Sequence, residues 1–293
     1  MNDLIVAIKN RTNLTVRLEK KFSVVYYKKP SLFSKLLFKE IKYPDIYFHK
    51  GSLSSQAVFL IEKSSLIIVS SYAIKKEIIL KLPDLEASKI YVLYPYCIVK
   101  MDYDKSIKKE FKNRFHIPKS SKILFFRAKD LARSGLDVLF DILSRMYQDK
   151  FTLIIESSSK QITPLKLQME RSEFKFEYLL LEDYENIDEL FIASDIFILP
   201  TQQKYFATDI LKAMYFRNAV FLMESNHASE IVDTFSLIQS AEDRSVSFKV
   251  DSLLINQDEL KKIQKENEKI AKNYTLEKSV EKISKIILNL FDI

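Results

Sequence analysis

The chain has 293 residues, 47% of them hydrophobic, and carries a formal net charge of +7 at pH 7. This length predicts two modest domains, each with a core of its own. The sequence has no long apolar run, so neither a signal peptide nor a membrane-spanning helix is expected. Its single cysteine, Cys97, excludes an internal disulfide, suits a reducing cytoplasm and is expected to be a small buried side chain.

Short apolar segments make up the first third of the chain. Residues 3–8, 22–27, 45–48 and 66–71 are predicted strands, and a helix is expected to start at Ala73. His49 directly follows the third of these strands. With three histidines that form no cluster and one cysteine, the sequence predicts no protein-built metal site and no cofactor.

Residues 28–42 form a basic amphipathic segment. Its apolar side chains fall on one helical face, its lysines lie elsewhere, and Ser31 is a candidate cap. The pattern suits an interfacial helix that lies on anionic lipid, and the alternative is a helix whose apolar face packs on the domain's own sheet. The apolar residues are Leu32, Phe33, Leu36, Leu37 and Ile41. The lysines predicted to face the membrane are Lys28, Lys29, Lys35, Lys39 and Lys42.

Two later apolar runs, residues 151–155 and 194–200, predict buried strands of a parallel sheet. A loop should span residues 201–207, and Thr208 or Asp209 is expected to cap a helix that ends at Arg217-Asn218. The next strand covers residues 219–223. The N-terminus of that helix should lie at the carboxyl edge of the sheet, where open α/β sheets bind anions.

The C-terminal segment predicts two helices. Residues 258–272 carry Glu and Lys at helical spacings with little apolar face, and Thr275 should cap a second helix over residues 276–290. The predicted packing stripe of this last helix is Val280, Ile283, Ile286, Ile287 and Leu290.

The stretches from Ser194 to Thr201, from Lys204 to Met214 and from Glu230 to Val232 resemble glycosyltransferase family 4, the retaining GT-B enzymes of glycosyl transferases group 1. The resemblance extends over most of the chain. Residues 89–95 look like the family's last strand of the N-domain, Ile117-Pro118 like its linker, and residues 122–126 like the first strand of the C-domain.

The resemblance implies an α/β fold of GT-B architecture, with two Rossmann-like domains that face each other across a cleft. The implied domains are residues 1–112, a shortened acceptor-side domain, and residues 113–275, the nucleotide-sugar-binding domain. Residues 276–293 would be a C-terminal helix that crosses back to the N-domain.

The chain departs from the family at two acidic positions. The family carries a Glu, seven residues and a second Glu, which are thought to meet the donor sugar and the ribose hydroxyls, and the matching residues here are Lys204 and Lys212. An ammonium group has three donors and no acceptor, so it cannot replace those contacts. Either the two lysines grip phosphate or an acidic sugar, or the pocket has decayed and they are ordinary solvated lysines.

The resemblance also assigns phosphate-binding residues. The sequence Arg133-Ser134-Gly135-Leu136-Asp137 is similar to the family's Arg-Lys-Gly-x-Asp, whose basic pair holds the donor diphosphate. Arg133 is kept and is assigned a catalytic role, whereas the lysine has become Ser134. Arg127 and Lys129 on the same loop are candidates to supply the missing charge. The residues assigned to donor binding are Arg127, Lys129, Ser134, Gly135, Lys204, Tyr205, Phe206, Ala207, Thr208, Lys212 and Glu230.

Glycine is scarce, which bears on the same loops. The chain holds two glycines, Gly51 and Gly135, whereas ordinary usage of ~7% would give on the order of twenty. Asn226-His227 stand where the family usually has a glycine pair, and their side chains are expected to reduce the room for a ligand. His49 stands where relatives place a histidine that contacts the sugar or the acceptor, and it is therefore assigned a catalytic role, with a satisfied structural histidine as the alternative.

The implied function is transfer of a sugar, with retention, from a nucleotide-sugar to a cell-envelope glycan, a lipid-linked acceptor or a protein. The alternative is an inactive GT-B homologue that acts as partner or scaffold of an active glycosyltransferase. The expected location is the cytoplasm, with peripheral contact to an anionic membrane surface on the inner face of the cell membrane. No nucleic-acid-binding motif is visible, so nucleic acid is not an expected partner.

Overall fold

The computed structural model describes residues 3–29, 42–171 and 174–291. The chain divides into two compact units, of which unit 1 comprises Met1–Tyr96 and Tyr274–Ile293, and unit 2 comprises Cys97–Asn273. The division falls before the expected boundary at residue 112, because helix α5 (Lys105–Arg114) packs on helix α8 (Ile187–Ala193) within unit 2. Cys97 is buried, as expected.

Unit 1 is built on a five-stranded parallel sheet with the strand order β2-β1-β3-β4-β5. Each of the four apolar segments predicted as strands forms one, and the segment at residues 89–95 contains the fifth. The strands are β1 (Leu4–Ile8), β2 (Val24–Tyr26), β3 (Ile46–Phe48), β4 (Leu66–Val69) and β5 (Ile90–Val92). The helices are α1 (Asn13–Glu19), α3 (Ser55–Lys63), α4 (Tyr72–Lys81) and α12 (Leu276–Phe291).

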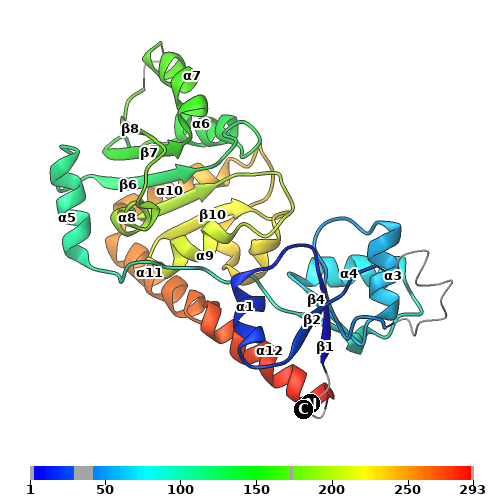
Figure 1. Ribbon diagram of the computed structural model, residues 1–293. Helices are drawn as coiled ribbons and strands as arrows, with labels where there is room; N and C mark the ends of the chain where they lie inside the picture. Colours follow the sequence, from blue (N-terminus) through cyan, green and yellow to red (C-terminus); the bar gives the residue numbers. More distant parts are fainter. Residues whose placement is uncertain (1–2, 30–41, 172–173, 292–293) are drawn as a thin grey trace. The chain divides into compact units, whose positions relative to one another are not determined.

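The two faces of this sheet are covered by different helices (Figure 1). On one face, alternate strand residues such as Leu4 and Val6 pack with α1 and with Val280, Ile283 and Ile287 of α12. On the other face, strand residues pack with α3 and α4. The C-terminal helix is therefore part of the core of unit 1. Leu290 was expected in its packing stripe but is 54% exposed, because Phe291 packs on the core at this end of the helix instead.

Unit 2 has a six-stranded parallel sheet with the order β11-β10-β9-β6-β7-β8. The predicted strands at residues 122–126, 151–155, 194–200 and 219–223 are all confirmed. The strands are β6 (Lys122–Arg127), β7 (Phe151–Ser157), β8 (Glu177–Glu182), β9 (Ile196–Leu199), β10 (Ala219–Met223) and β11 (Leu237–Ile238). The remaining helices are α6 (Leu136–Ser144), α7 (Ser159–Glu170), α9 (Thr208–Tyr215), α10 (Ser245–Ile255) and α11 (Gln257–Ala271).

The direction of winding reverses at β6, the first strand of this sheet. The chain adds β7 and β8 on one side of β6, and then β9, β10 and β11 on the other. The loops that leave the carboxyl ends of β6 and β9 are therefore neighbours, although they are far apart in the sequence. Open α/β sheets bind their ligands at such a switch point.

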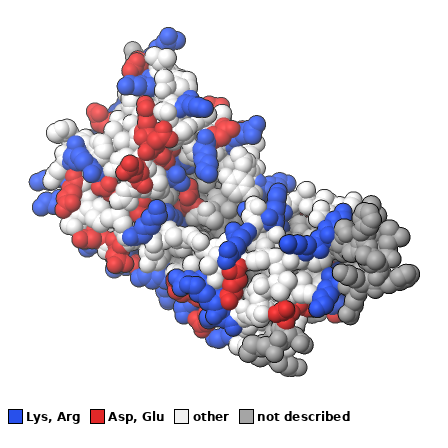
Figure 2. All heavy atoms as spheres, viewed as in Figure 1, with Lys and Arg blue, Asp and Glu red and all other residues white. Residues whose placement is uncertain are grey.

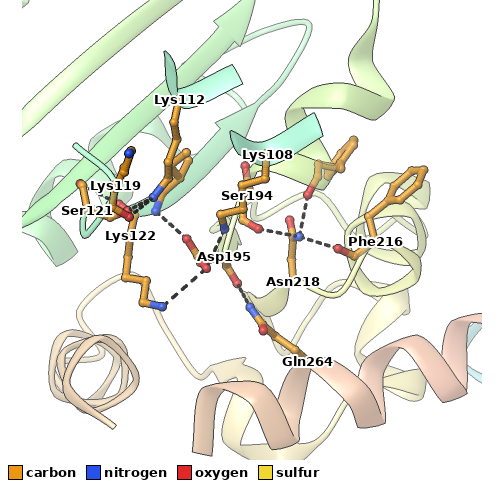
Figure 3. A network of polar contacts seen from close by, with 12 residues as sticks. Lys108, Lys112, Lys119, Ser121, Lys122, Ser194, Asp195, Phe216, Asn218 and Gln264 are labelled. Atoms are coloured by element: carbon orange, nitrogen blue, oxygen red, sulfur yellow. Dashed lines mark hydrogen bonds and ion pairs between the residues drawn. The ribbon is translucent and has the colours of Figure 1, made fainter. Parts of the chain in front are cut away.

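Asp195, the residue before β9, is the centre of a polar network that attaches helices to the sheet (Figure 3). Its Oδ2 accepts a hydrogen bond from the backbone N–H of Ile123 in β6 at 2.9 Å, and its Oδ1 lies 2.8 Å from Nζ of Lys108 in α5. Gln264 of α11 donates to its carbonyl oxygen at 3.1 Å. The buried carboxylate of Asp195 thus joins the start of β6 to α5, and its backbone carbonyl joins the start of β9 to α11.

Lys112 closes the turn between α5 and β6 in the same network. Its side chain is buried, and its Nζ donates to the carbonyl oxygens of Lys119, at 3.0 Å, and Ser121. Burial, aided by the charge of Lys108, lowers the pKa of Lys112. These contacts give α5 its place in unit 2.

The loops after β6 and β9 touch backbone to backbone. Gly135 caps the N-terminus of α6 with φ +90°, and a Cβ added there would lie 2.1 Å from the carbonyl oxygen of Pro200 at the end of β9. Only glycine combines this left-handed conformation with such a close approach. The loop after β6 is therefore held against the end of β9 at the switch point.

Replacing Gly135 with alanine is expected to lower the free energy of unfolding by about 2 kcal/mol or more, because the side chain collides with Pro200 and strains the backbone. Gly51→Ala is the matched control, since Gly51 has φ +96° but no atom within 4 Å of an added Cβ. This control should lose only about 1–2 kcal/mol, from backbone strain alone. Urea denaturation of both variants measures the difference, and equal losses would contradict the tight contact.

Candidate functional site

A cavity of about 390 Å³ lies in unit 2 at the carboxyl ends of β6 and β9. Its walls come from the loop after β6, the loop after β9 and the first turn of α9. The lining residues are Arg127, Ala128, Lys129, Asp130, Arg133, Ser134, Leu199, Gln203, Tyr205, Ala207, Thr208 and Asp209. The topology therefore creates a polar hollow at the position that the sequence predicted for anion binding.

Arg127, the last residue of β6, is held between two carboxylates. Its Nε donates to Glu156 at 2.9 Å and its Nη1 donates to Asp209 at 2.7 Å. Burial lowers the pKa of Arg127, but the charges of Asp209 and Glu156 outweigh burial and leave this pKa raised. Its charge is thus compensated within the protein.

Two further cations lie at the cavity. Arg133 has 80% of its side chain exposed, and its only ion pair among the described residues is with Asp130 at 3.5 Å. Its carbonyl oxygen accepts from Thr201 and Gln203, each at 3.3 Å, so the backbone of this loop is tied to the loop after β9. Lys129 is exposed as well, and no ion pair to it occurs in the described parts of the chain. These two side chains offer positive charge to a ligand.

The first turn of α9 forms the opposite wall. Ala207 is the N-cap and supplies no side-chain cap, so Thr208 and Asp209 are the first two helical residues rather than the expected cap. Uncapped N–H groups at a helix N-terminus favour an anion. Tyr205, just before this turn, is 52% exposed, and burial together with the charge of Asp209 raises its pKa.

Asn226 holds this wall in place. It is fully buried, its Oδ1 accepts from the backbone N–H groups of Ala207 and Ala228 at 3.3 and 3.0 Å, and its Nδ2 donates to the carbonyl oxygen of Gln203 at 2.9 Å. Neither Asn226 nor His227 lines the cavity. The expectation that these two residues reduce the room for a ligand is therefore not met, because Asn226 points into the protein and fastens the loop.

Lys204 and Lys212, two lysines predicted to bind the donor, lie outside the cavity lining. Lys204 is exposed. Lys212, in the second turn of α9, forms an ion pair with the buried Asp188 at 2.6 Å, and Asp188 also accepts from the backbone N–H of Lys100 at 2.6 Å. The ammonium of Lys212 is thus paired with Asp188 and does not line the cavity.

Of the other residues predicted to bind the donor, some line the cavity and others do not. Ser134, Tyr205, Ala207 and Thr208 line the cavity together with Arg127, Lys129 and Arg133. Gly135, Phe206 and Glu230 do not. Phe206 is buried, and Glu230 is exposed in the 3-10 helix His227–Ile231. The part that these residues play in donor binding remains a prediction.

His49 lies in unit 1, where it follows β3 and is 5% exposed. Its Nδ1 is 3.1 Å from the hydroxyl of Tyr47, whereas its Nε2 is buried with no hydrogen-bond partner. Burial lowers the pKa of His49, which favours a neutral ring. The catalytic role of His49 and the structural alternative both remain predictions.

The membrane prediction falls mostly on residues outside the described part of the chain, including Lys35, Lys39 and the apolar face of the expected helix. Lys28, Lys29 and Lys42 are exposed. None of the described helices is long and apolar enough to span a membrane.

Within the described ranges, no group of three or more His, Cys, Asp or Glu side chains could hold a metal ion. On the face of unit 2 seen in Figure 2, acidic and basic side chains are interspersed.

Sequence reasoning missed three acidic residues of this region. Asp209 was considered only as a helix cap, and Glu156 and Asp188 were not assigned a role. Each pairs with a cation that is distant in the sequence, as in Arg127 with Asp209 and Lys212 with Asp188. Of the three, only Asp209 lies within a segment that resembles the family, the stretch from Lys204 to Met214.

Residues 107–270 match the family model described as glycosyl transferases group 1, and this match covers more than half of the chain. The chain belongs to this family. No curated protein is significantly similar to it in sequence.

Solved structures of GT-B glycosyltransferases share the fold. Alr3699/HepE from Anabaena, solved in complex with UDP, is 15% identical over 99% of this chain and 100% of that chain, with a TM-score of 0.73. A glycosyltransferase from Rickettsia africae ESF-5 is 15% identical over 98% and 89%, with a TM-score of 0.66. WaaG, a glycosyltransferase involved in lipopolysaccharide biosynthesis, is 14% identical over 96% and 85%, with a TM-score of 0.64. The chain therefore has the GT-B fold, with two parallel sheets and interleaved helices.

The ion pair between Lys212 and Asp188 yields a stability prediction. Lys212→Met should lower the free energy of unfolding by about 3 kcal/mol, because it leaves the buried carboxylate of Asp188 without its counter-charge. Lys212→Glu should destabilise more, since it places two carboxylates together.

The double variant Lys212→Met with Asp188→Asn is the control, because it removes both charges and keeps an acceptor for Lys100. Urea denaturation should show most of the lost stability recovered. A Lys212→Glu variant as stable as the unchanged chain would contradict the role of the pair.

Proposed function

We propose that this glycosyltransferase-family chain transfers a sugar, with retention, from a nucleotide-sugar to an acceptor, and that the unit 2 cavity binds the donor diphosphate. The observation that carries the proposal is the pair of available cations, Lys129 and Arg133, opposite the uncapped first turn of α9. A diphosphate needs such a set of donors. The similar structure of Anabaena Alr3699/HepE in complex with UDP-glucose supports a sugar nucleotide as the ligand.

In this proposal the protein acts through electrostatics. The bond between the anomeric carbon and the diphosphate oxygen breaks, and Arg133, Lys129 and the α9 N–H groups stabilise the negative charge that develops on the leaving group. The acceptor hydroxyl attacks from the face on which the diphosphate leaves, and its proton passes to the departing phosphate. No nucleophile from the protein and no metal ion enters this scheme.

The proposed acceptor is a cell-envelope glycan, a lipid-linked acceptor or a protein, reached at the inner face of the membrane. The similarity to WaaG supports an envelope glycan. The exposed lysines Lys28, Lys29 and Lys42 support contact with anionic lipid, which attracts basic segments.

One observation favours the alternative of a catalytically inactive partner or scaffold. Neither lysine that replaces a family Glu lines the cavity, and Lys212 is committed to Asp188. The family's two carboxylates are therefore absent without a substitute at those positions. Donor binding is the property that separates the two functions.

Calorimetric titration with UDP, GDP, CMP and ADP and their sugar conjugates tests the proposal. One nucleotide should bind saturably, and Arg133→Ala should weaken this binding on the order of 10- to 100-fold, because it removes charged hydrogen bonds to phosphate. Lys166→Ala is the matched control, since Lys166 is an exposed cation of α7 outside the cavity. Absence of binding by all nucleotides would overturn the proposal and favour the scaffold.

A further inference from the structure

Asp209 places an acceptor among the donors of the cavity. Its side chain is 30% exposed, and Oδ2 accepts the hydrogen bond from Nη1 of Arg127 at 2.7 Å. No hydrogen bond to its other oxygen, Oδ1, occurs among the described residues. The carboxylate is thus anchored at one oxygen and available at the other.

Arg127 fixes this carboxylate from behind. The guanidinium also donates to Glu156, which is 5% exposed and lies outside the cavity lining. With two carboxylates on one guanidinium, Arg127 has little charge left to offer to a phosphate. Its geometric effect is to hold Asp209 in one orientation at the N-terminus of α9, where negative charge is favourable.

The other acidic lining residue is already occupied. Asp130 accepts the backbone N–H of Arg133 at Oδ1 and lies 3.5 Å from the Arg133 side chain at Oδ2. Of the two lining carboxylates, Asp209 is therefore the one with an uncommitted oxygen. A carboxylate accepts hydrogen bonds and repels phosphate, so its partner on a ligand must be a neutral donor such as a hydroxyl.

We propose that the Oδ1 of Asp209 accepts a hydrogen bond from a hydroxyl of the bound sugar nucleotide, and that Asp209 thereby selects a hydroxylated donor over a bare diphosphate. The inference rests on the proposed function, because it assigns a second contact to the same ligand. The hydroxyl belongs either to the ribose or to the transferred sugar, which share this chemistry. Lys129 and Arg133 hold the charged part of the ligand, and Asp209 holds a neutral part.

The test compares Asp209→Ala with Glu156→Gln, which weakens the same guanidinium anchor without changing the cavity lining. The probes are the nucleoside diphosphate among UDP, GDP and ADP that binds, its 2′,3′-dideoxy analogue, its glucose conjugate and inorganic pyrophosphate. Dissociation constants come from calorimetry, and thermal unfolding of each variant confirms that it is folded.

Asp209→Ala should weaken binding of the nucleoside diphosphate or its glucose conjugate on the order of 10-fold or more, and should leave pyrophosphate binding unchanged or tighter. If the hydroxyl is on the ribose, the dideoxy analogue should bind this variant and the unchanged chain equally. If it is on the transferred sugar, only the glucose conjugate should show the loss. Glu156→Gln should show a smaller loss with the same probes that Asp209→Ala affects.

Two results would overturn the inference in different ways. Equal affinity of the unchanged chain and Asp209→Ala for every hydroxylated probe would remove the role of Asp209 while leaving the proposed function intact. No binding of any nucleotide by the unchanged chain would remove the proposed function, and the inference with it.

Discussion

The contact between Gly135 and Pro200 is the constraint on which the cavity depends. It brings the loop after β6 against the end of β9, and it exists only because β6 and β9 are neighbours where the winding of the sheet reverses. The hydrogen bonds of Thr201 and Gln203 to the carbonyl of Arg133 then join the same two loops. With its walls fixed in this way, the cavity can present Arg133 and α9 to one ligand.

Which cations near the cavity are available to a ligand depends on which of them are paired with a carboxylate, not on how many there are. Asp188 holds Lys212, and Glu156 and Asp209 hold Arg127, so two of the cations nearest the family's binding loops are neutralised inside the protein. The cations that remain available, Lys129 and Arg133, are the exposed ones. Lys212 is therefore part of the structural framework, with the buried Asp188 as its partner.

The same pairing gives the proposed donor site two chemical characters. Exposed cations and an uncapped helix suit a diphosphate, because charge develops there as the sugar leaves. The anchored carboxylate of Asp209 suits a hydroxyl, because it can accept the hydrogen bond that the hydroxyl donates. The cations and N–H groups of the cavity can only donate. Asn226 supports both characters of the site, because its hydrogen bonds fasten the loop that leads into α9. The family resemblance predicts a glycine at the position of Asn226 itself.

The sequence by itself predicted most of the strands of both sheets and indicated the family. Residues 219–223 form a strand with the predicted bounds, because a short, fully apolar run next to turn residues has few other ways to be buried. Tertiary structure alone decided what each charged residue does. Lys212 has the same chemistry in sequence whether it is solvated, binds phosphate or pairs with Asp188. The Arg127–Asp209 pair joins the end of β6 to the first turn of α9, 82 residues later in the chain. Such contacts depend on which loops the topology brings together, and a local pattern of residues does not contain that information.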